Sequence, residues 1–250
     1  MTKLSDSARN EYSQFGEDGI IEEILSICGN GAKTCVEFGA WDGVHYSNTA
    51  KLWKNGWKAV LIESDSTKFK ELVAGAPGCF CLNVRITISG KDSIDQLLSV
   101  AGVEHVDLMS IDVDGDDYHI FKSMSIRPRI IICEYNPTIP IGIEVVGEPG
   151  EKIGASATAL EVMARNKGYS PIAMTETNCF FVRSCDAPLF SKYETSMEKM
   201  FDPKHLTYLI SAYDGTFLLS RTPTYGLADW NKNRLSNGKL RGRHERHGDH

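Results

Sequence analysis

The stretch TCVEFGAWDGVHYS, residues 34–47, decides the fold of this chain. It begins with a short apolar run through Cys35, Val36 and Phe38, which suits a buried parallel strand. Gly39 and Gly43 then mark backbone that must turn tightly or approach another group closely. A helical pattern follows. We therefore expect a strand, a glycine turn and a helix, with a ligand close to the turn.

The same alternation continues through the first half of the chain. Further strand-like runs occupy residues 59–63, 79–84, 106–112 and 130–135. Helical segments occupy residues 17–28, 47–54, 66–74, 93–101 and 116–124. Apolar strands that alternate with amphipathic helices predict an α/β fold with a doubly wound, mostly parallel sheet and helices on both faces.

The second half of the chain departs from this alternation. Residues 137–156 are rich in proline and glycine and are expected to form a loop or lid. It would lie on the acceptor side of the domain, where the molecule to be modified would bind. A helix is expected at residues 158–167, followed by strand-like runs at residues 169–176 and 178–184. These two runs predict an antiparallel hairpin at one edge of the sheet.

The pattern divides the chain into three parts. One domain is expected over residues 1–187, and a helical extension over residues 188–230. The extension would lie on the domain or in the interface of a homodimer. Residues 231–250 are polar and basic without periodicity, which predicts a disordered tail.

Composition excludes several classes of partner. The net charge of -6 gives no general attraction to a polyphosphate backbone, so we expect no nucleic-acid partner. Residues 1–14 lack the apolar centre of a signal peptide, and no run is long enough to span a membrane. Most of the seven cysteines lie in apolar runs, which indicates reduced thiols and a cytoplasmic protein.

Polar side chains end each predicted strand, where open parallel sheets bind their ligands. In chain order they are Glu37 and Asp42 on either side of Gly39, then Glu63 and Ser64, then Asn83, then the acidic run 112–117, and finally Glu134 and Asn136. Each of them alone also fits ordinary capping and turn chemistry. Together they predict a site along one edge of the sheet.

The spacing favours a nucleoside cofactor. Glu63 lies about twenty residues beyond the glycine turn, where a carboxylate can accept both hydroxyls of a ribose. The turn has one glycine too few for the dinucleotide fingerprint, and Asp42 would repel a pyrophosphate. The same charge suits the cationic sulfonium or amino group of S-adenosylmethionine, so an NAD-dependent oxidoreductase is disfavoured.

Five segments in order carry a family resemblance: YSQFGEDGIIEEIL, CVEFGAWDGVHYSNTAKLW, AVLIESD, VDLMSIDVDGDDYHIFKSM and IIICEYNPTIP. Over residues 12–184 the chain resembles class I S-adenosylmethionine-dependent methyltransferases, closest to FkbM-like enzymes that methylate sugar hydroxyls and other small polar groups. The resemblance implies a seven-stranded Rossmann-like methyltransferase fold.

The resemblance also implies roles for individual residues. Glu37 and Gly39 would form the first cofactor motif, with Asp42 near the methionine moiety. Glu63 would bind the ribose, and Asp112 would lie beside the methyl group. The remaining residues that we assign to the cofactor site are Gln14 and Phe15, which would fold over the cofactor, and Ser64 and Asn83 at strand ends.

The acidic run suggests a divalent cation as well. Oxygen ligands such as Asp114, Glu134 and Asn136 suit Mg²⁺, and the sequence resembles sugar O-methyltransferases with an Asp-Gly-Asp turn that use such an ion. The alternative is that Asp116 and Asp117 cap the following helix.

The predicted reaction is methyl transfer to a small polar acceptor, most simply a hydroxyl of a sugar or related intermediate. Because a hydroxyl must lose its proton, the catalytic candidates are Asp112, His119 and His45. Two alternatives stay open: methylation of a nitrogen or carboxylate, and a nucleoside-binding scaffold that kept the fold without the reaction.

Overall fold

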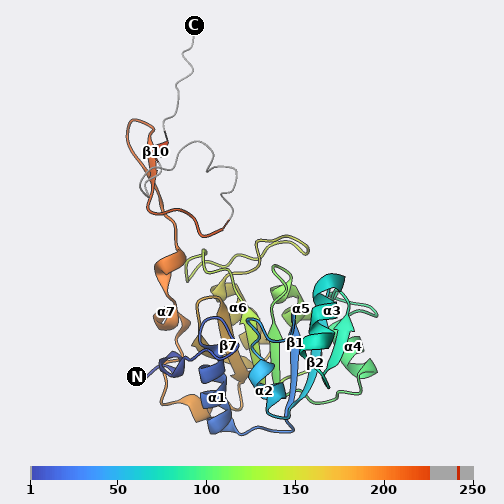
Figure 1. Cartoon of the computed structure of the whole chain (residues 1–250). Coiled ribbons are helices and arrows are strands. Elements are labelled where there is room, and N and C mark those ends of the chain that lie inside the picture. The colour runs from blue at the N-terminus through green and yellow to red at the C-terminus, as the bar shows by residue number, and fades with distance from the viewer. Residues whose placement is uncertain (1, 226–240, 243–250) are drawn as a thin grey trace. The chain divides into compact units, whose positions relative to one another are not determined.

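Seven strands form one sheet in the order β3-β2-β1-β4-β5-β7-β6 (Figure 1). The computed structural model describes residues 2–225 and 241–242. The strands are β1 (Thr34–Phe38), β2 (Lys58–Glu63), β3 (Phe80–Asn83), β4 (Leu108–Ile111), β5 (Ile130–Glu134), β6 (Tyr169–Met174) and β7 (Asn178–Arg183). The first five strands are parallel, whereas β7 runs antiparallel to both β5 and β6.

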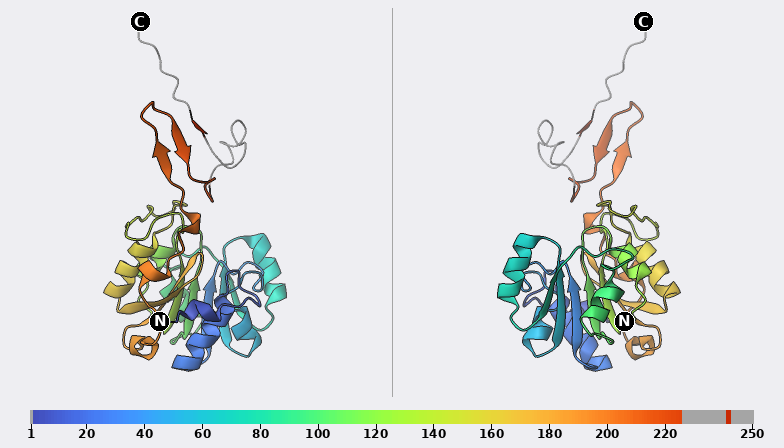
Figure 2. Two further views of the ribbon diagram at one scale, coloured as in Figure 1. Left: turned by 90° about the vertical axis from the view of Figure 1, so that its left-hand side faces the viewer. Right: turned by 90° about the vertical axis from the view of Figure 1, so that its right-hand side faces the viewer.

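Helices cover both faces of this sheet (Figure 2). One apolar core lies under α4 (Ile94–Val100), α5 (Asp117–Ser123), α6 (Ala157–Asn166) and α7 (Met197–Met200). The other lies under α1 (Glu17–Cys28), α2 (Ala50–Lys54), α3 (Ser66–Gly75), η1 (Leu4–Ser7) and η2 (Ala187–Phe190). Neighbouring strand residues alternate between the two cores, as Cys35 and Val36 do.

The predicted fold class is therefore confirmed. The sheet is doubly wound and mostly parallel, with seven strands and an antiparallel hairpin of β6 and β7 at one edge. Cys35, Cys133 and Cys179 are buried in the sheet, as their apolar surroundings predicted. Residues 137–156 form a loop, in which an isolated bridge joins Val146 to Ala155.

The chain divides into two units at different places from those predicted. The larger unit contains Met1–Asn136 and Ile141–Phe201, and the smaller contains Pro137–Pro140 and Asp202–His250. The main domain continues past residue 187 because Phe190 and Met197 are buried in its two cores.

The smaller unit corrects the prediction of a helical extension. It contains the short helix η3 (Pro203–His205), and then β8 (Leu209–Ser211) and β9 (Phe217–Leu219), which pair as an antiparallel hairpin. Helix prediction failed here because the turn at Asp214 and Gly215 reverses the chain between two apolar runs. Of the predicted disordered tail, only Arg241–Gly242 lies within the described residues, where it forms β10 beside β9.

No helix within residues 2–225 and 241–242 has the length and apolar character needed to cross a membrane.

Candidate functional site

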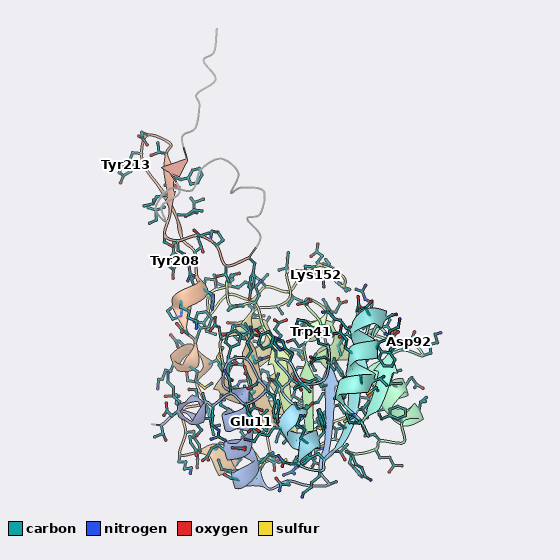
Figure 3. The ribbon with its side chains drawn as sticks, in the orientation of Figure 1. Glu11, Trp41, Asp92, Lys152, Tyr208 and Tyr213 are labelled. Carbon is teal, nitrogen blue, oxygen red and sulfur yellow. The ribbon has the colours of Figure 1, made fainter. Side chains whose placement is uncertain are left out.

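A cavity of about 660 Å³ lies at the carboxyl ends of the parallel strands. Phe38 lines it at the end of β1 with Gly39 directly after that strand, Glu63 at the end of β2, Asp112 after β4 and Glu134 at the end of β5. The rest of the lining is Gln14, Trp41, His45, Tyr46, Ile62, Ser64, Asp65, Lys68, Val84, Arg85, Ile86, Val113, Asp114, Asp116, Gly150 and Lys152, of which Figure 3 labels Trp41 and Lys152. Open α/β sheets bind their ligands at this edge.

Gly39 brings two walls of the cavity together. Its φ is +65°, a left-handed conformation that side chains with a Cβ rarely adopt. A Cβ at this position would lie 2.1 Å from the backbone oxygen of Asp112. Only glycine therefore allows the loop after β1 to approach the loop after β4 so closely.

Glu37 holds the next turn in place and does not line the cavity. Its Oε2 accepts hydrogen bonds from the hydroxyls of Ser47 and Thr49, each at 2.6 Å, and its Oε1 accepts one from the backbone N–H of Asn48 at 2.7 Å. Burial raises the pKa of Glu37. The structure thus gives this residue a positioning role in place of the predicted cofactor contact.

Three further predicted contacts also lie outside the cavity lining. Asp42 caps its own turn, since its Oδ1 accepts from the backbone N–H groups of Val44 at 2.9 Å and His45 at 2.7 Å. Asn83 donates its side-chain amide to the backbone oxygen of Glu63 at 2.8 Å, which ties β3 to β2. Phe15, which follows Gln14 in the sequence, is half-buried and does not line the cavity, whereas Gln14 does.

Glu63 is the buried acid that faces the cavity. It is 5% exposed, and each carboxylate oxygen already accepts one backbone N–H, from Trp41 at 3.0 Å and from Asp65 at 2.7 Å. These bonds fix the carboxylate, while each oxygen keeps a further lone pair for a donor in the cavity. A ribose diol offers two such donors, so the predicted role fits this geometry.

A buried carboxylate positions Gln14. The Oδ2 of Asp18 accepts the backbone N–H groups of Glu11, Tyr12 and Ser13 and the Ser13 hydroxyl, all at 2.8 Å. Asp18 is 1% exposed. This cluster curls the segment before α1, so that Gln14 lies in the cavity wall.

Three acids form the end of the cavity at β4 and β5. Asp112, Asp114 and Glu134 offer oxygens that all lie within 4.8 Å of one another. Asp112 and Glu134 are hydrogen-bonded to each other, and burial, together with the neighbouring negative charges, raises the pKa of both. The shared hydrogen bond and the raised pKa values favour a proton held between the two carboxyls, which the pair can exchange with a bound ligand.

Asp117 supports this end of the cavity from behind. Its carboxylate accepts the backbone N–H groups of Val113 at 2.8 Å and Gly115 at 2.9 Å, and burial raises its pKa to about 6. The cap predicted for Asp117 is thus a clamp on the turn that presents Asp112 and Asp114.

Of the three predicted metal ligands, the structure brings Asp114 and Glu134 together but not Asn136. Asn136 is absent from the cavity lining, and its amide nitrogen donates to the backbone oxygen of Ile153 at 2.9 Å. Asp112 takes its place in the group. The donors are all carboxylate oxygens, which fit a hard divalent cation such as Mg²⁺.

The two candidate histidines differ. His45 lies in the cavity lining beside Trp41, with ring centroids 5.3 Å apart. His119 lies outside the lining, because its Nε2 is hydrogen-bonded to the backbone oxygen of Gly147 at 2.8 Å. The structure therefore keeps His45 as a candidate base and assigns His119 to holding the 145–156 loop.

Three cations at the rim were missed from the sequence. Lys68 lies over the Trp41 ring at 4.5 Å from its centroid, Arg85 lies 3.6 Å from Asp116, and Lys152 lies 3.9 Å from Asp114. They follow no motif, and the strand-end rule finds only the acids. Lys68 could have been anticipated from its place in the first turn of the helix after β2.

No family model and no curated protein matches the sequence. Solved structures with a similar fold include an amino pentose methyltransferase from Micromonospora echinaspora with S-adenosylmethionine bound (9% identity, TM-score 0.44, covering 67% of this chain and 89% of that one). A putative caffeoyl-CoA O-methyltransferase from Staphylococcus aureus shows 14% identity and a TM-score of 0.43, with 66% and 81% covered.

The N-terminal domain of EvdMO1 with S-adenosylhomocysteine bound shows 13% identity and a TM-score of 0.41, covering 66% of this chain and 79% of that one. These similarities concern the fold. The function of this chain is therefore argued below from the geometry of its own residues.

Proposed function

We propose that this chain is an S-adenosylmethionine-dependent methyltransferase that acts on a small polar acceptor, most simply a hydroxyl. The observation that carries the proposal is one cavity that joins the fixed Glu63 carboxylate at the end of β2 to two acids, Asp112 after β4 and Glu134 at the end of β5. A nucleoside would bind at the first place, and chemistry would occur at the second.

The cavity residues fit this cofactor better than a dinucleotide. Glu63 offers lone pairs to a ribose diol, and the acids Asp112 and Glu134 favour a cationic group over a pyrophosphate. The volume of the cavity, about 660 Å³, lies in the range of small-molecule sites. S-adenosylmethionine supplies an electrophilic methyl group when it is bound.

The protein's own part in the reaction is to orient the acceptor and to take its proton. Holding two reactants in a water-poor pocket can supply about 7–11 kcal/mol of the barrier reduction in well-oriented systems. A carboxylate oxygen of the Asp112–Glu134 pair would accept the proton of the acceptor hydroxyl as the hydroxyl oxygen takes the methyl group, and S-adenosylhomocysteine would be the leaving group. His45 offers a second acceptor in the same cavity.

A divalent cation is the second part of the proposal. Asp112, Asp114 and Glu134 would hold Mg²⁺ through carboxylate oxygens, and the ion would bind neighbouring oxygens of the acceptor and favour loss of the proton. The same acids suit an acceptor amine, so both hydroxyl and amino acceptors belong in the screen.

The deciding experiment is calorimetric titration of the chelator-treated protein with S-adenosylhomocysteine, with NAD as the comparison. We expect binding of S-adenosylhomocysteine and none of NAD. A folded protein that binds NAD alone would contradict the proposal, and one that binds neither would favour a scaffold that kept the fold without the reaction and without this cofactor.

The cation is tested separately by repeating the titration with Mg²⁺ and Mn²⁺ for the wild type and for Asp114→Asn. We expect the ions to bind the wild type and to bind the variant more weakly. Equal ion affinities of the wild type and the variant would contradict the metal site, whereas the proposal of methyltransferase activity would still stand.

A further inference from the structure

The hairpin of β8 and β9 exposes apolar side chains on both of its faces. Leu209 pairs with Leu219 and Ile210 pairs with Leu218, so successive pairs point to opposite sides. Leu209 is 61% exposed and Ile210 is 53% exposed. Tyr208 and Tyr213, labelled in Figure 3, add exposed aromatic rings to the same hairpin.

The turn of this hairpin is well defined. The backbone N–H of Ala212 donates to the oxygen of Thr216 at 2.8 Å, and Asp214 accepts both the N–H and the hydroxyl of Thr216. Gly215 has a φ of +81°, as such turns require. The sequence thus specifies the hairpin, yet a two-stranded hairpin is at best marginally stable in water without a covered apolar face.

One edge of the hairpin is also open within the described residues. The small sheet has the order β10-β9-β8, which leaves β8 at its edge. Natural edge strands usually carry charges or proline, which prevent pairing with another chain. Residues 206–213 contain neither, and Asp214 in the turn is the only charged residue in residues 206–219.

We propose that residues 206–219 form a dimerisation arm, in which β8 pairs antiparallel with β8 of a second copy of this chain. Two identical edges related by a two-fold axis present the same surface to each other, which is the arrangement of most homodimers. The strands of the hairpin carry no charged side chain that could form ion pairs with a charged partner. A second copy of the chain would instead present the same apolar side chains.

Pairing of the two edges would join the two hairpins into one antiparallel sheet. Backbone hydrogen bonds would then form between the facing β8 strands, and the side chains of Leu209, Ile210 and Ser211 would contact those of the second copy across the two-fold axis.

Sedimentation velocity of the full chain across a wide range of concentration tests the proposal. We expect a dimer for the wild type and a monomer for Ile210→Lys and Leu209→Lys, each of which places a charge on one face. The matched control is Val100→Lys, because Val100 is an apolar residue on α4 that is 80% exposed, and it should leave the dimer intact.

Thermal unfolding of each variant shows that the main domain is still folded. A wild type that stays monomeric, or a dimer that survives both arm substitutions, would overturn the proposal. A monomeric wild type that binds phosphatidylcholine vesicles through the same residues would also overturn it and would assign the hairpin to a lipid surface.

Discussion

At the scale of single residues, the site depends on carboxylates whose protein partners are already fixed. Glu63 and Glu37 are both buried strand-end acids, but only Glu63 faces the cavity. Glu37 uses its oxygens for Ser47, Asn48 and Thr49. The same residue type near the ends of neighbouring strands thus faces the cavity in one case and supports loop architecture in the other.

Replacing Glu63 with alanine should weaken binding of S-adenosylhomocysteine by about 1–3 kcal/mol, since it removes a charged hydrogen-bond acceptor. Calorimetric titration gives the affinity, and circular dichroism confirms that the variant is folded. Glu71→Ala is the matched control, because Glu71 is an exposed acid on the neighbouring helix α3. An affinity unchanged by Glu63→Ala would place the ribose elsewhere.

The raised pKa of Asp112 predicts a cost in stability at high pH. Burial and nearby acids raise it from an ordinary value of 3.8 to about 7, so the folded protein keeps a proton that the unfolded chain releases. Between these values the folded state binds more protons, and its stability falls as the pH rises through this window. Asp112→Asn removes one carboxyl of the hydrogen-bonded pair and also a negative charge that raises the pKa of Glu134, so it should reduce this fall.

Thermal unfolding in the presence of a chelator measures this effect. We compare the free energy of unfolding of Asp112→Asn with that of the wild type at each pH. The difference in favour of the variant should be about 1–3 kcal/mol larger at about pH 8 than at about pH 5. The rate of methyl transfer should fall in the same variant. Asp114→Asn is the control, because the Asp114 side chain is 82% exposed and should show little pH-dependent gain. The same gain in both variants would mean that general charge repulsion, and not burial of Asp112, sets the pH dependence.

At the scale of elements, the segment before α1 is built as a strap against the cavity. Asp18 gathers the backbone N–H groups of residues 11–13 at one carboxylate oxygen. Glu17 fastens the start of α1 to the hairpin of β6 and β7, since its Oε1 accepts from Thr175 at 2.7 Å and Asn178 at 3.1 Å. The strap therefore connects Gln14 to the same sheet that carries the acids.

Asp18→Asn should loosen this strap, because the N–H groups that now share one oxygen of a charged carboxylate would share the weaker acceptor of a neutral amide. We expect faster hydrogen exchange in residues 11–14, a loss of stability of about 1–3 kcal/mol and weaker binding of S-adenosylhomocysteine. Asp6→Asn, at an exposed acid of η1, is the control. Faster exchange with undiminished affinity would show that the strap does not contact the cofactor.

The elements themselves were largely predictable from the sequence. The structure agrees with the bounds expected for the helix at residues 17–28 (α1) and for the strand at residues 34–38 (β1). In both cases the period of the apolar residues and the glycine that follows mark where the element ends. Residues 206–213 were predicted as helix because a short apolar run has no decisive period.

The site was predictable only in its location. The strand-end rule correctly placed Glu63, Asp112 and Glu134 around one cavity. It could not show that Asp42 and Asn83 are used by their own turns, because those hydrogen bonds depend on loop geometry. The contact of Lys68 with the Trp41 ring was not predictable because it depends on the packing of α3, although the place of Lys68 in the first turn of that helix could have marked it as a cation near the cavity.

At the scale of the whole molecule, the two units have different kinds of stability. The larger unit contains both apolar cores, which run from Leu4 to Phe201. The hairpin strands of the smaller unit are exposed or half-buried along their whole length. The fold and the cavity should thus depend on the larger unit, and the smaller should matter for association.

A chain that ends at Phe201 tests this division. Because every residue that lines the cavity and both cores lies before the cut, we expect the shortened protein to unfold in one cooperative transition near the wild-type temperature and to bind S-adenosylhomocysteine with the same affinity. It should also be monomeric, since it lacks the dimerisation arm. Calorimetry and sedimentation measure the three properties, with a chain shortened only to Tyr225 as the control. A loss of folding or of cofactor binding on removal of residues 202–225 would show that the smaller unit supports the site as well.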